Sequence, residues 1–507
     1  MSDSSVFDGP LPAPQRYFVL GTVTLATMLG AMSSTIAYAV LPQMQGALSA
    51  TQDQIAWSVT FNLMAMAVAT PTTGWLANRF GRRRIFLVSV IIFSLATVMC
   101  GAADSLETLI AYRVVQGLFV APIVPLSQAI MLGAFPHHQR GLATAIWGMG
   151  VVIGPIVGPT IGGYVAEAYN WRWVFFMIGP LCVLSVFLVW VFITDNRRLQ
   201  GTRMDWIGFV ALTVAIASFQ LIMDRGDRLD WYESLEVIIE TFLAAATFYI
   251  FLVHSFTAAH PFLPPHLLAD RNFALGLCFA VVFGALSFVP LALLPPLLQN
   301  LRGFPDSLIG TILAARGFGS LMGNFAVVAM GRFDPRMSLA IGFICQGLSG
   351  LCMAQFNLDV SIWDAMWTSA FQGFGNSFLW VPLTILAYAT LHPRQLGEAT
   401  AVFHLLRNLG SAIFISICVG VAVHYASVNY SVMSEVVTPF NEIFRFPSLS
   451  GAWRIDNLGG LARMSGEVSR QAAMVGYVNA FYVFSALALS VVPFIFLLKR
   501  PPPRQGS

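Results

Sequence analysis

The chain of 507 residues is too apolar and too poor in charge to be an ordinary soluble protein. Hydrophobic residues make up 57% of it and charged residues only 10%, whereas soluble domains carry about 25% charged residues. This composition excludes a disordered chain, a secreted disulfide-rich scaffold and a free cytosolic enzyme. The six cysteines form no Cys-x-x-Cys pair, so we expect neither a disulfide framework nor a metal site, and no cofactor.

Apolar stretches long enough to cross a bilayer recur along the whole sequence. A helix needs about 20 apolar residues to span a hydrocarbon core of about 30 Å. Fourteen such stretches predict an all-α polytopic membrane protein. The expected spans are residues 17–41, 55–77, 85–103, 107–132, 141–165, 173–194, 206–224, 235–256, 272–298, 307–330, 337–357, 362–391, 399–426 and 475–498. An even number of spans places both termini on the same side of the membrane.

Basic residues between the spans set the expected orientation. With the N-terminus inside, the inner segments hold twice as many Arg and Lys residues as the outer segments. We therefore expect both termini, residues 1–16 and 499–507, to be cytoplasmic. Residues 427–474 form one long polar interruption, which favours a partly structured extracytoplasmic loop over a folded domain. No basic patch indicates nucleic-acid binding.

The loop after the second expected span combines glycine with arginine. Glycine allows a tight reversal of the chain, and arginine can hold helix C-terminal carbonyls or acidic partners. The residues that carry this pattern are Gly74, Asn78, Arg79, Gly81, Arg82 and Arg83. We expect them to act in conformational gating, and a simple basic anchor for membrane topology is the alternative.

The fourth expected span contains an arginine close to its start. An arginine within a span is costly and normally faces a polar interior. Gln116 follows Arg113 by three residues and therefore lies on nearly the same helix face. We expect the two side chains to share a polar interior. The alternative is that Arg113 extends to the outer surface, about 9 Å away.

The fifth expected span carries glycine at a fixed spacing. Glycines four residues apart share one helix face and allow very close helix contact. Prolines between them remove backbone hydrogen bonds and soften the helix. The pattern consists of Gly150, Gly154, Gly158, Gly162 and Gly163, with Pro155 and Pro159 between them. A smooth, bendable helix suits an interface that opens and closes, and static packing is the alternative.

In this order and spacing, the three patterns resemble those of the major facilitator superfamily. They match its Gly-x-Leu-Ala-Asp-Arg-x-Gly-Arg loop, its Arg-x-x-Gln-Gly helix and its Gly-Pro-x-x-Gly-Gly antiporter helix. Fourteen spans are typical of its drug:proton antiporter branch of the EmrB/QacA type. Further matches, which extend the resemblance over roughly residues 17–498, are Asp205-Trp206-Ile207-Gly208, Asp224-Arg225-Gly226 and Leu405-Leu406-Arg407-Asn408.

The resemblance implies a major facilitator fold of two six-helix bundles, at 17–200 and 257–498, with an inserted helix pair at 201–256. It further implies a transporter of the cytoplasmic (inner) membrane, which exports amphiphilic drugs or toxic small molecules in exchange for protons by alternating access. The implied partners are a small-molecule substrate, protons and the lipid bilayer. Some relatives also work with a periplasmic adaptor protein and an outer-membrane channel.

Two positions depart from the family's pattern. The acidic position of the loop motif is Asn78, so an ion pair is reduced there to a hydrogen bond. Many relatives carry an aspartate in the first span at the position of Ser33, which lies about 24 Å from the cytoplasmic face, at a depth similar to Arg113. We expect no other carboxylate deep within a span, and Glu240 is the nearest candidate. The resemblance therefore does not supply a proton-binding residue at position 33.

Three arginines, Arg113, Arg316 and Arg407, lie within expected spans. Polar neighbours such as Gln116 and Asn408, water or a bound anion must offset their charges. We expect Arg113 and Arg316 to give the cavity a positive potential that favours anionic or neutral amphiphiles; structural bonds to carbonyls at helix breaks are the alternative. His404 lies one turn before Arg407 and is a further coupling candidate, or a structural histidine.

The sequence leaves two other classes of function open. An importer or uniporter of a small organic metabolite, such as an anion, is compatible with Ser33, although the glycine-rich helix argues against it. A membrane-embedded enzyme or sensor needs a catalytic dyad, a metal cluster or a soluble signalling domain, and the sequence contains none. We therefore expect a transporter and no enzymatic activity.

Overall fold

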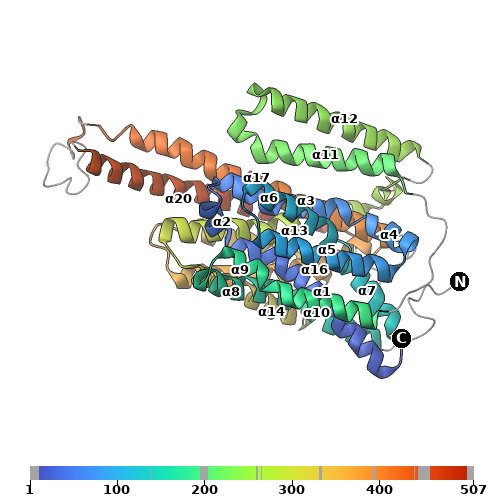
Figure 1. Ribbon diagram of the computed structural model, residues 1–507. Coiled ribbons are helices and arrows are strands. Elements are labelled where there is room, and N and C mark those ends of the chain that lie inside the picture. The colour runs from blue at the N-terminus through green and yellow to red at the C-terminus, as the bar shows by residue number, and fades with distance from the viewer. Residues whose placement is uncertain are drawn as a thin grey trace.

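The computed structural model describes residues 11–136, 139–193, 204–258, 261–263, 265–329, 334–391, 396–438, 440–442 and 457–499. Helices dominate this part of the chain (Figure 1). The N-terminal helices are α1 (Ala13–Ala39), α2 (Leu41–Ala47), α3 (Gln52–Ala69), α4 (Thr72–Phe80), α5 (Arg82–Gly101), α6 (Leu106–Val120), α7 (Ile123–Ala134), α8 (Arg140–Ala168), α9 (Trp171–Phe176) and α10 (Ile178–Phe192).

A pair of helices and then a second large group follow along the chain. The pair consists of α11 (Trp206–Arg225) and α12 (Leu235–Thr257). The C-terminal helices are α13 (Arg271–Pro296), α14 (Asp306–Ala329), α15 (Pro335–Met353), α16 (Ile362–Tyr388), α17 (Leu396–Ser434) and α20 (Leu458–Ser490). A π-helical turn, Leu297–Leu301, continues α13, and short 3-10 turns lie at Pro265–Ala269 and Val492–Leu497.

Each of the fourteen expected spans coincides with one helix or with two consecutive helices. Among the described residues, eleven helical segments are long and apolar enough to cross a membrane, and the bent pair α3–α4 makes a twelfth. The all-helical architecture is therefore confirmed, whereas the number of fourteen crossings stays a prediction.

Several expected spans are broken where proline interrupts the backbone hydrogen bonds. α3 and α4 meet at Pro71 with a bend of 55°. α6 ends before Pro122, and α7 continues from Ile123. Proline has no N–H to donate to the preceding turn, and its ring clashes with the carbonyl four residues back. These breaks let one membrane segment change direction in its interior.

The expected loop at 427–474 is largely helical in its described parts, which corrects its boundaries. α17 continues to Ser434, and α20 already begins at Leu458, where Asn457 accepts a hydrogen bond from Gly460 N at 2.6 Å. The two helices project together beyond the other helices (Figure 1). Both ends of this hairpin carry polar residues at helical spacing, which a search for apolar runs cannot detect. The expected residues 443–456 lie outside the described part of the chain.

The N-terminal and C-terminal helices meet along two seams. One seam is formed by α8 and α14, and the other by α3 and α17. α11 packs against α12, α3 and α17, so it covers the second seam from the side, while α12 lies at the edge of the molecule (Figure 1). This arrangement fits two helical bundles with an inserted pair. The exact domain boundaries stay a prediction.

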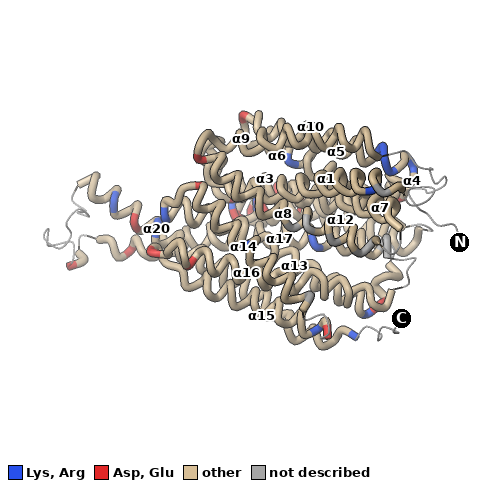
Figure 2. The backbone as a smooth tube through the Cα atoms, turned by 90° about the horizontal axis from the view of Figure 1, so that it is seen from below, with Lys and Arg blue, Asp and Glu red and all other residues tan. Residues whose placement is uncertain are grey.

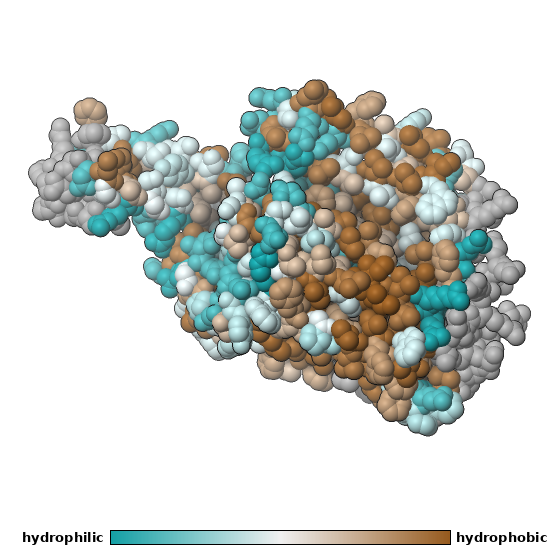
Figure 3. Space-filling model, viewed as in Figure 1, coloured by the Kyte–Doolittle hydropathy of each residue, from teal (hydrophilic) through white to brown (hydrophobic). Residues whose placement is uncertain are grey.

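The surface separates apolar and charged residues along the long direction of the helices. Apolar side chains gather over the middle of the helices (Figure 3). Lys and Arg residues gather at the end that holds both termini, whereas many Asp and Glu residues lie toward the opposite end (Figure 2). An apolar belt between two polar ends is the arrangement that a lipid bilayer requires of a protein that spans it.

Asp205 fixes the inserted pair to the chain that follows it. Its carboxylate accepts hydrogen bonds from Gly208 N at 2.9 Å and from Phe262 N at 2.8 Å. His254 Nε2 at the end of α12 lies 2.7 Å from the same carboxylate. Burial alone would raise the pKa of Asp205, but these three hydrogen bonds outweigh it and hold the pKa below its ordinary value of 3.8.

Replacing Asp205 with alanine is expected to destabilise the protein by about 2 kcal/mol, because α11 loses its N-cap and Phe262 N loses its acceptor. A group with a lowered pKa stabilises the fold above its ordinary pKa, and this stabilisation is lost as the pH falls through the folded value. The difference in melting temperature between Asp205→Ala and the parent protein should therefore be constant near neutral pH and shrink below about pH 4. Thermal unfolding of detergent-purified protein at several pH values measures it, and a difference that grows on acidification would contradict the assignment.

Candidate functional site

Arg113 lies in a closed polar network within the N-terminal helices. Its Nε donates to Ser58 O on α3 at 3.1 Å, and its Nη1 donates to Gln116 Oε1 at 2.5 Å. Gln116 Nε2 in turn donates to Ser33 Oγ on α1 and to Thr97 Oγ1 on α5, both at 2.8 Å. Both Arg113 and Gln116 are buried. The predicted Arg113–Gln116 pairing is confirmed, and the alternative in which Arg113 reaches the outer surface is wrong.

Ser33 lies beside Arg113, as its similar depth in the first span predicts. Arg113 Nη1 is 3.4 Å from Ser33 O, and the Arg113 guanidinium carbon lies 5.9 Å from the centre of the Phe175 ring. The neutral oxygens of Ser33, Ser58 and Gln116 thus take the place of a counter-ion. Arg113 Nη2 is buried and has no hydrogen-bond acceptor within the described residues.

The C-terminal helices contain a second network built on the same helix contact. Gln116-Gly117 on α6 has a counterpart in Gln372-Gly373 on α16. Gly117 faces the carbonyl of Asn62, and Gly373 faces the carbonyl of Arg316. Arg316 therefore stands in the C-terminal group where Asn62 stands in the N-terminal group.

Arg316 is held by bonds to two neighbouring helices. Its Nε donates to Gln372 Oε1 at 2.5 Å, and its Nη2 donates to Ser287 O on α13 at 2.7 Å. Gln372 Nε2 donates to Gln346 Oε1 at 2.9 Å, which extends the network to α15. The two halves of the molecule therefore each present one partly or fully buried guanidinium, on α6 and on α14.

Tyr38 lies at the contact between the two halves, and sequence reasoning missed it. It is fully buried on α1, its ring stacks on Phe288 of α13 with 6.2 Å between the centroids, and it lies within electrostatic reach of both Arg113 and Arg316. The Tyr38 hydroxyl has no hydrogen-bond partner within the described residues. A hydroxyl and a guanidinium N–H without acceptors therefore lie close to the contact between the halves, and a buried donor of this kind calls for an explanation.

Arg407 and His404 lie on α17 beside an aromatic cluster. Arg407 Nη2 donates to Asn408 Oδ1 at 2.8 Å, and its guanidinium carbon lies 5.1 Å from the centre of the Trp380 ring. The His404 ring lies 5.7 Å from the same ring of Trp380 and 6.0 Å from Phe403. Asn408 thus supports Arg407, as expected, and the two candidates lie apart from the Arg113 network.

The regular glycine stripe of α8 faces α1 and not the other half of the molecule. A side chain on Gly150, Gly154, Gly158 or Gly162 would meet Thr24, Met28, Met32 or Ile36 of α1, respectively. For Gly154, an added Cβ would lie 2.5 Å from Met28 O. Both sets repeat every four residues, so the two helices interlock along their length. These four glycines form a contact within the N-terminal helices, as the static-packing alternative has it.

The contact of α8 with the other half lies on a different face. Gly163 faces the carbonyl of Asp306 and lies close to Gly310, where an added Cβ would be 3.2 Å from Gly310 Cα. Gly310 in turn faces Pro159 O at 2.6 Å. Gly163 and Pro159 are therefore the members of the predicted motif that contact α14. This contact is at the end opposite the termini, and there the two halves are closed against each other.

Asp306 adds hydrogen bonds between the halves at this closed end, although the sequence predicted no buried carboxylate here. Gln43 Nε2 of α2 donates to it at 2.5 Å, and Gln299 Nε2 donates to it at 3.0 Å. Gln43 also donates to Ala166 O of α8 at 3.2 Å. Asp306 is buried. A carboxylate of α14 is thus bonded to the N-terminal half through an amide.

The predicted basic loop has the geometry of a tight reversal. Gly81 joins α4 to α5 with φ of 95°, a conformation that favours glycine. Arg83 Nη2 donates to Trp190 O near the C-terminal end of α10 at 2.9 Å, which is the kind of helix-end contact that the pattern indicates. Gly74 and Arg79 are exposed, and Asn78 and Arg82 are partly buried. The proposed gating role of this loop stays a prediction.

A second carboxylate also corrects the expectation that no acid lies deep in a span. Asp224, near the end of α11, accepts hydrogen bonds from Thr60 Oγ1 at 3.1 Å, from Gln220 Nε2 at 3.0 Å and from Ser416 Oγ. Glu240, the candidate chosen from the sequence, instead pairs with Arg225 at 3.6 Å. The sequence placed Asp224 at the end of its span, where it counted as interfacial. Within the described ranges, no three His, Cys, Asp or Glu residues form a metal site.

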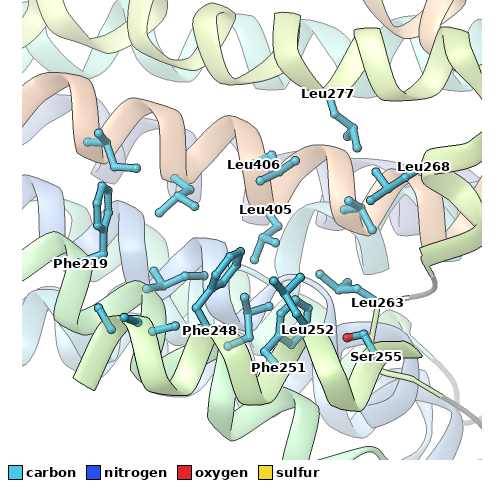
Figure 4. Close-up of a pocket in the computed structure, with 18 of the residues that line it drawn as sticks. Phe219, Phe248, Phe251, Leu252, Ser255, Leu263, Leu268, Leu277, Leu405 and Leu406 are labelled. Carbon is cyan, nitrogen blue, oxygen red and sulfur yellow. The ribbon is translucent and has the colours of Figure 1, made fainter. Parts of the chain in front are cut away.

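An apolar cavity of about 630 Å³ lies between the inserted pair and the C-terminal helices (Figure 4). Phe219 of α11 and Phe248, Phe251 and Leu252 of α12 line one side, and Leu405 and Leu406 of α17 line the other. Ile222 and Met223, which precede Asp224, also line it. Its size is in the range of drug-binding pockets, and its walls are almost wholly hydrophobic.

Comparison with known proteins identifies the family. The family model of the Major Facilitator Superfamily matches residues 23–427. The chain is 30% identical over 506 residues to the multidrug export protein EmrB of Escherichia coli K12, and the match covers 97% of each chain. It is 28% identical to the fatty acid resistance protein FarB of Neisseria gonorrhoeae, over 97% of this chain and 98% of FarB.

Solved structures share the fold. A D-xylose–proton symporter has a TM-score of 0.63 at 12% identity, with 97% of this chain and 99% of the symporter covered. A bacterial homologue of the human lysosomal transporter Spinster, in an inward-facing and unoccupied conformation, has a TM-score of 0.62 at 18% identity, with 96% and 97% covered. With a family model that matches most of its length and a relative of 30% identity over nearly its whole length, the chain belongs to the Major Facilitator Superfamily, a family of membrane transport proteins rather than enzymes.

Proposed function

We propose that the protein is a proton-driven exporter of amphiphilic small molecules that works by alternating access. The observation that carries this proposal is its similarity, over nearly its whole length, to multidrug export proteins. The seam between α8 and α14 supports it, because small residues meet there and the Gln43–Asp306 contact beside them is a hydrogen bond that can break when the halves separate. The domain division into bundles at 17–200 and 257–498 and an inserted pair at 201–256 is part of this proposal.

The proposed orientation places both termini in the cytoplasm and the closed end outside, in the cytoplasmic (inner) membrane. Lys and Arg residues gather at the end that bears the termini (Figure 2), as the positive-inside rule requires of the cytoplasmic side. The projecting hairpin of α17 and α20 then lies on the outer side. A periplasmic adaptor protein and an outer-membrane channel would complete the export path there.

The proposed substrates are neutral or anionic amphiphiles. Tyr38 packs on Phe288 of α13 at the contact between the halves, and the Tyr38 hydroxyl and Arg113 Nη2 are buried donors without acceptors in the described part of the chain. A carboxylate or phenolate could accept both hydrogen bonds, whereas a quaternary ammonium group could accept neither. A fatty acid resistance protein among the relatives is compatible with this preference.

Inverted membrane vesicles from a host without its own drug pumps test this proposal. With an acidic interior, we expect vesicles that contain the protein to accumulate phenolic and weak-acid amphiphiles, and nigericin to abolish this accumulation by removing the pH gradient. Vesicles without the protein give the passive distribution of each weak acid. Protease removal of a C-terminal tag in inverted but not right-side-out vesicles checks the orientation. Strong uptake of quaternary ammonium dyes alone would contradict the substrate class, and uptake that is insensitive to nigericin would contradict proton coupling.

A further inference from the structure

The carboxylate of Asp224 lies in a polar cluster at the seam between α3 and α17. It accepts hydrogen bonds from the hydroxyl groups of Thr60 on α3 and Ser416 on α17, and from the amide of Gln220 one turn earlier on α11. Gln220 Nε2 also donates to Ser416 Oγ at 2.8 Å. Gln220 and Ser416 are buried. All three partners can donate hydrogens to the carboxylate, which is the arrangement that suits its ionised form.

This cluster joins three separate parts of the molecule. Thr60 belongs to the N-terminal half, Ser416 to the C-terminal half, and Asp224 to the inserted pair. Trp57 Nε1 of α3 also donates to the backbone carbonyl of Asp224 at 3.3 Å. α3 and α17 form one of the two seams between the halves. Any movement that separates them must therefore break or rearrange the hydrogen bonds of Asp224.

The charged groups around the cluster are engaged elsewhere. Arg225 pairs with Glu236 of α12 at 2.5 Å, and His424 of α17 lies 3.1 Å from Asp227. On the remaining sides, Arg228 lies over the Trp57 ring at 5.0 Å, Asp53 is the acidic residue of the first turn of α3, and Glu240 pairs with Arg225. No basic side chain in the described part of the chain bonds to the Asp224 carboxylate. Its charge is balanced by hydrogen bonds alone.

A carboxylate held in this way is sensitive to its protonation state. Removing an ionised carboxylate from water costs free energy that strong hydrogen-bond donors must offset. A protonated carboxyl group is neutral, so its removal from water costs far less. Addition of a proton turns one of its oxygens from an acceptor into a donor, so it cannot keep all three hydrogen bonds. Protonation therefore changes the stability of the contact between α3 and α17. Titratable groups within membrane segments commonly mark ion pathways for this reason.

We propose that Asp224 binds and releases the transported proton, in place of the acidic residue that is absent at position 33. The proposal rests on the proposed function, since it needs a proton-driven transporter. When the outer end is open, an Asp224 carboxylate oxygen forms an O–H bond with a proton taken from extracytoplasmic water. The neutral acid is buried when that end closes, and the proton leaves to water on the cytoplasmic side. Thr60, Gln220 and Ser416 position the carboxylate and stabilise its ionised form.

The test uses purified, full-length protein in liposomes that contain a pH-sensitive dye. Asp224→Asn keeps the size and most of the hydrogen bonds of the side chain but cannot titrate. We expect it to lose accumulation driven by a pH gradient and the accompanying proton movement, while substrate exchange between the two sides without a gradient persists. Glu240→Gln, which neutralises the other carboxylate of the inserted pair, is the matched control and should keep both activities.

Ser416→Ala provides a second variant, because it removes one donor without removing the acid. We expect the pH dependence of transport to shift toward alkaline pH by about one unit. The infrared difference spectrum between low and high pH contains the carbonyl bands of the carboxyl groups that titrate, and loss of one component in Asp224→Asn reports the titration of Asp224 whether or not transport occurs.

The outcomes separate this inference from the proposed function. A parent protein without gradient-driven accumulation contradicts the proposed function. A coupled parent protein whose Asp224→Asn variant still accumulates substrate and moves protons overturns the role of Asp224. If Asp224→Asn does not fold, an unchanged pH profile in Ser416→Ala overturns it instead.

Discussion

Replacing Gly163 with leucine is expected to abolish transport while leaving the protein folded in the membrane. An added Cβ at this position already overlaps the carbonyl of Asp306 and lies 3.2 Å from Gly310 Cα, so the α8–α14 seam cannot close at the end opposite the termini. Overpacking of this kind costs about 1–3 kcal/mol, which lowers the ratio of closed to open protein by roughly 5- to 150-fold. Leucine is a better helix former than glycine, so α8 itself remains intact.

The measurement combines transport at matched expression with labelling of the seam. A cysteine introduced at Gln43, which donates to Asp306 at the closed end, should react faster with a membrane-impermeant maleimide from outside when Gly163 is leucine. Gly148→Leu is the matched control, because an added Cβ there meets no atom within 4 Å. Normal transport and unchanged labelling in Gly163→Leu would show that this end of the seam does not need to close.

Gly154→Leu on the same helix tests the contact of α8 with α1, which does not lie between the two halves. Its added Cβ would lie 2.5 Å from Met28 O and 3.1 Å from Met32 N, both on α1. That contact lies within the N-terminal helices, so this variant should lower the melting temperature of the protein without a selective change in seam labelling. The same glycine pattern thus makes contacts on two faces of α8, one with α1 and one with α14, which the spacing in the sequence does not distinguish.

The Arg113 site could be predicted from the sequence because the spacing of residues along single helices indicates its contacts. Gln116 follows Arg113 by one helical turn, and Ser33 lies at a similar depth when residues are counted from the ends of their spans. The structure confirms both contacts. The second network could have been found by the same means, because Gln372-Gly373 repeats Gln116-Gly117 in the other half. Only its arginine comes from a different helix, which no spacing along α16 reveals.

The enclosed positions of Asp306, which is buried, and Asp224, which is partly buried, could not be predicted because they come from tertiary structure. Asp224 and Asp306 lie at or next to the ends of expected spans, where a carboxylate is ordinarily solvated. In the structure, α3 and α17 cover Asp224, and α2 and the end of α13 cover Asp306. A hydropathy count treats each span separately and therefore cannot see a neighbouring helix that extends beyond it. The long helical hairpin of α17 and α20 was missed for a related reason, since its polar residues keep a helical period without being apolar.

Replacing Arg113 with alanine is expected to reduce transport of every substrate at least tenfold. The change removes a donor from Ser58 O and Ser33 O and leaves the buried Gln116 Oε1 without its donor. An unsatisfied buried group costs about 1–3 kcal/mol. Part of this effect is structural, so loss of transport in Arg113→Ala does not by itself show contact with the substrate. Melting temperature and transport are measured together for that reason, and transport that equals that of the parent protein would contradict any role for Arg113.

Tyr38→Phe distinguishes contact with the substrate from a structural role. The Tyr38 hydroxyl has no partner within the described residues, so its removal should leave the melting temperature unchanged. If it donates to an anionic substrate beside Arg113 and Arg316, its loss removes a hydrogen bond to a charged group, which is worth about 1.5–3 kcal/mol. We therefore expect KM for weak-acid and phenolate substrates to rise at least tenfold, with a smaller rise for neutral ones. Tyr477→Phe, which removes a buried hydroxyl from α20, is the control. Equal KM values for Tyr38→Phe and the parent protein with anionic substrates would place the substrate headgroup elsewhere.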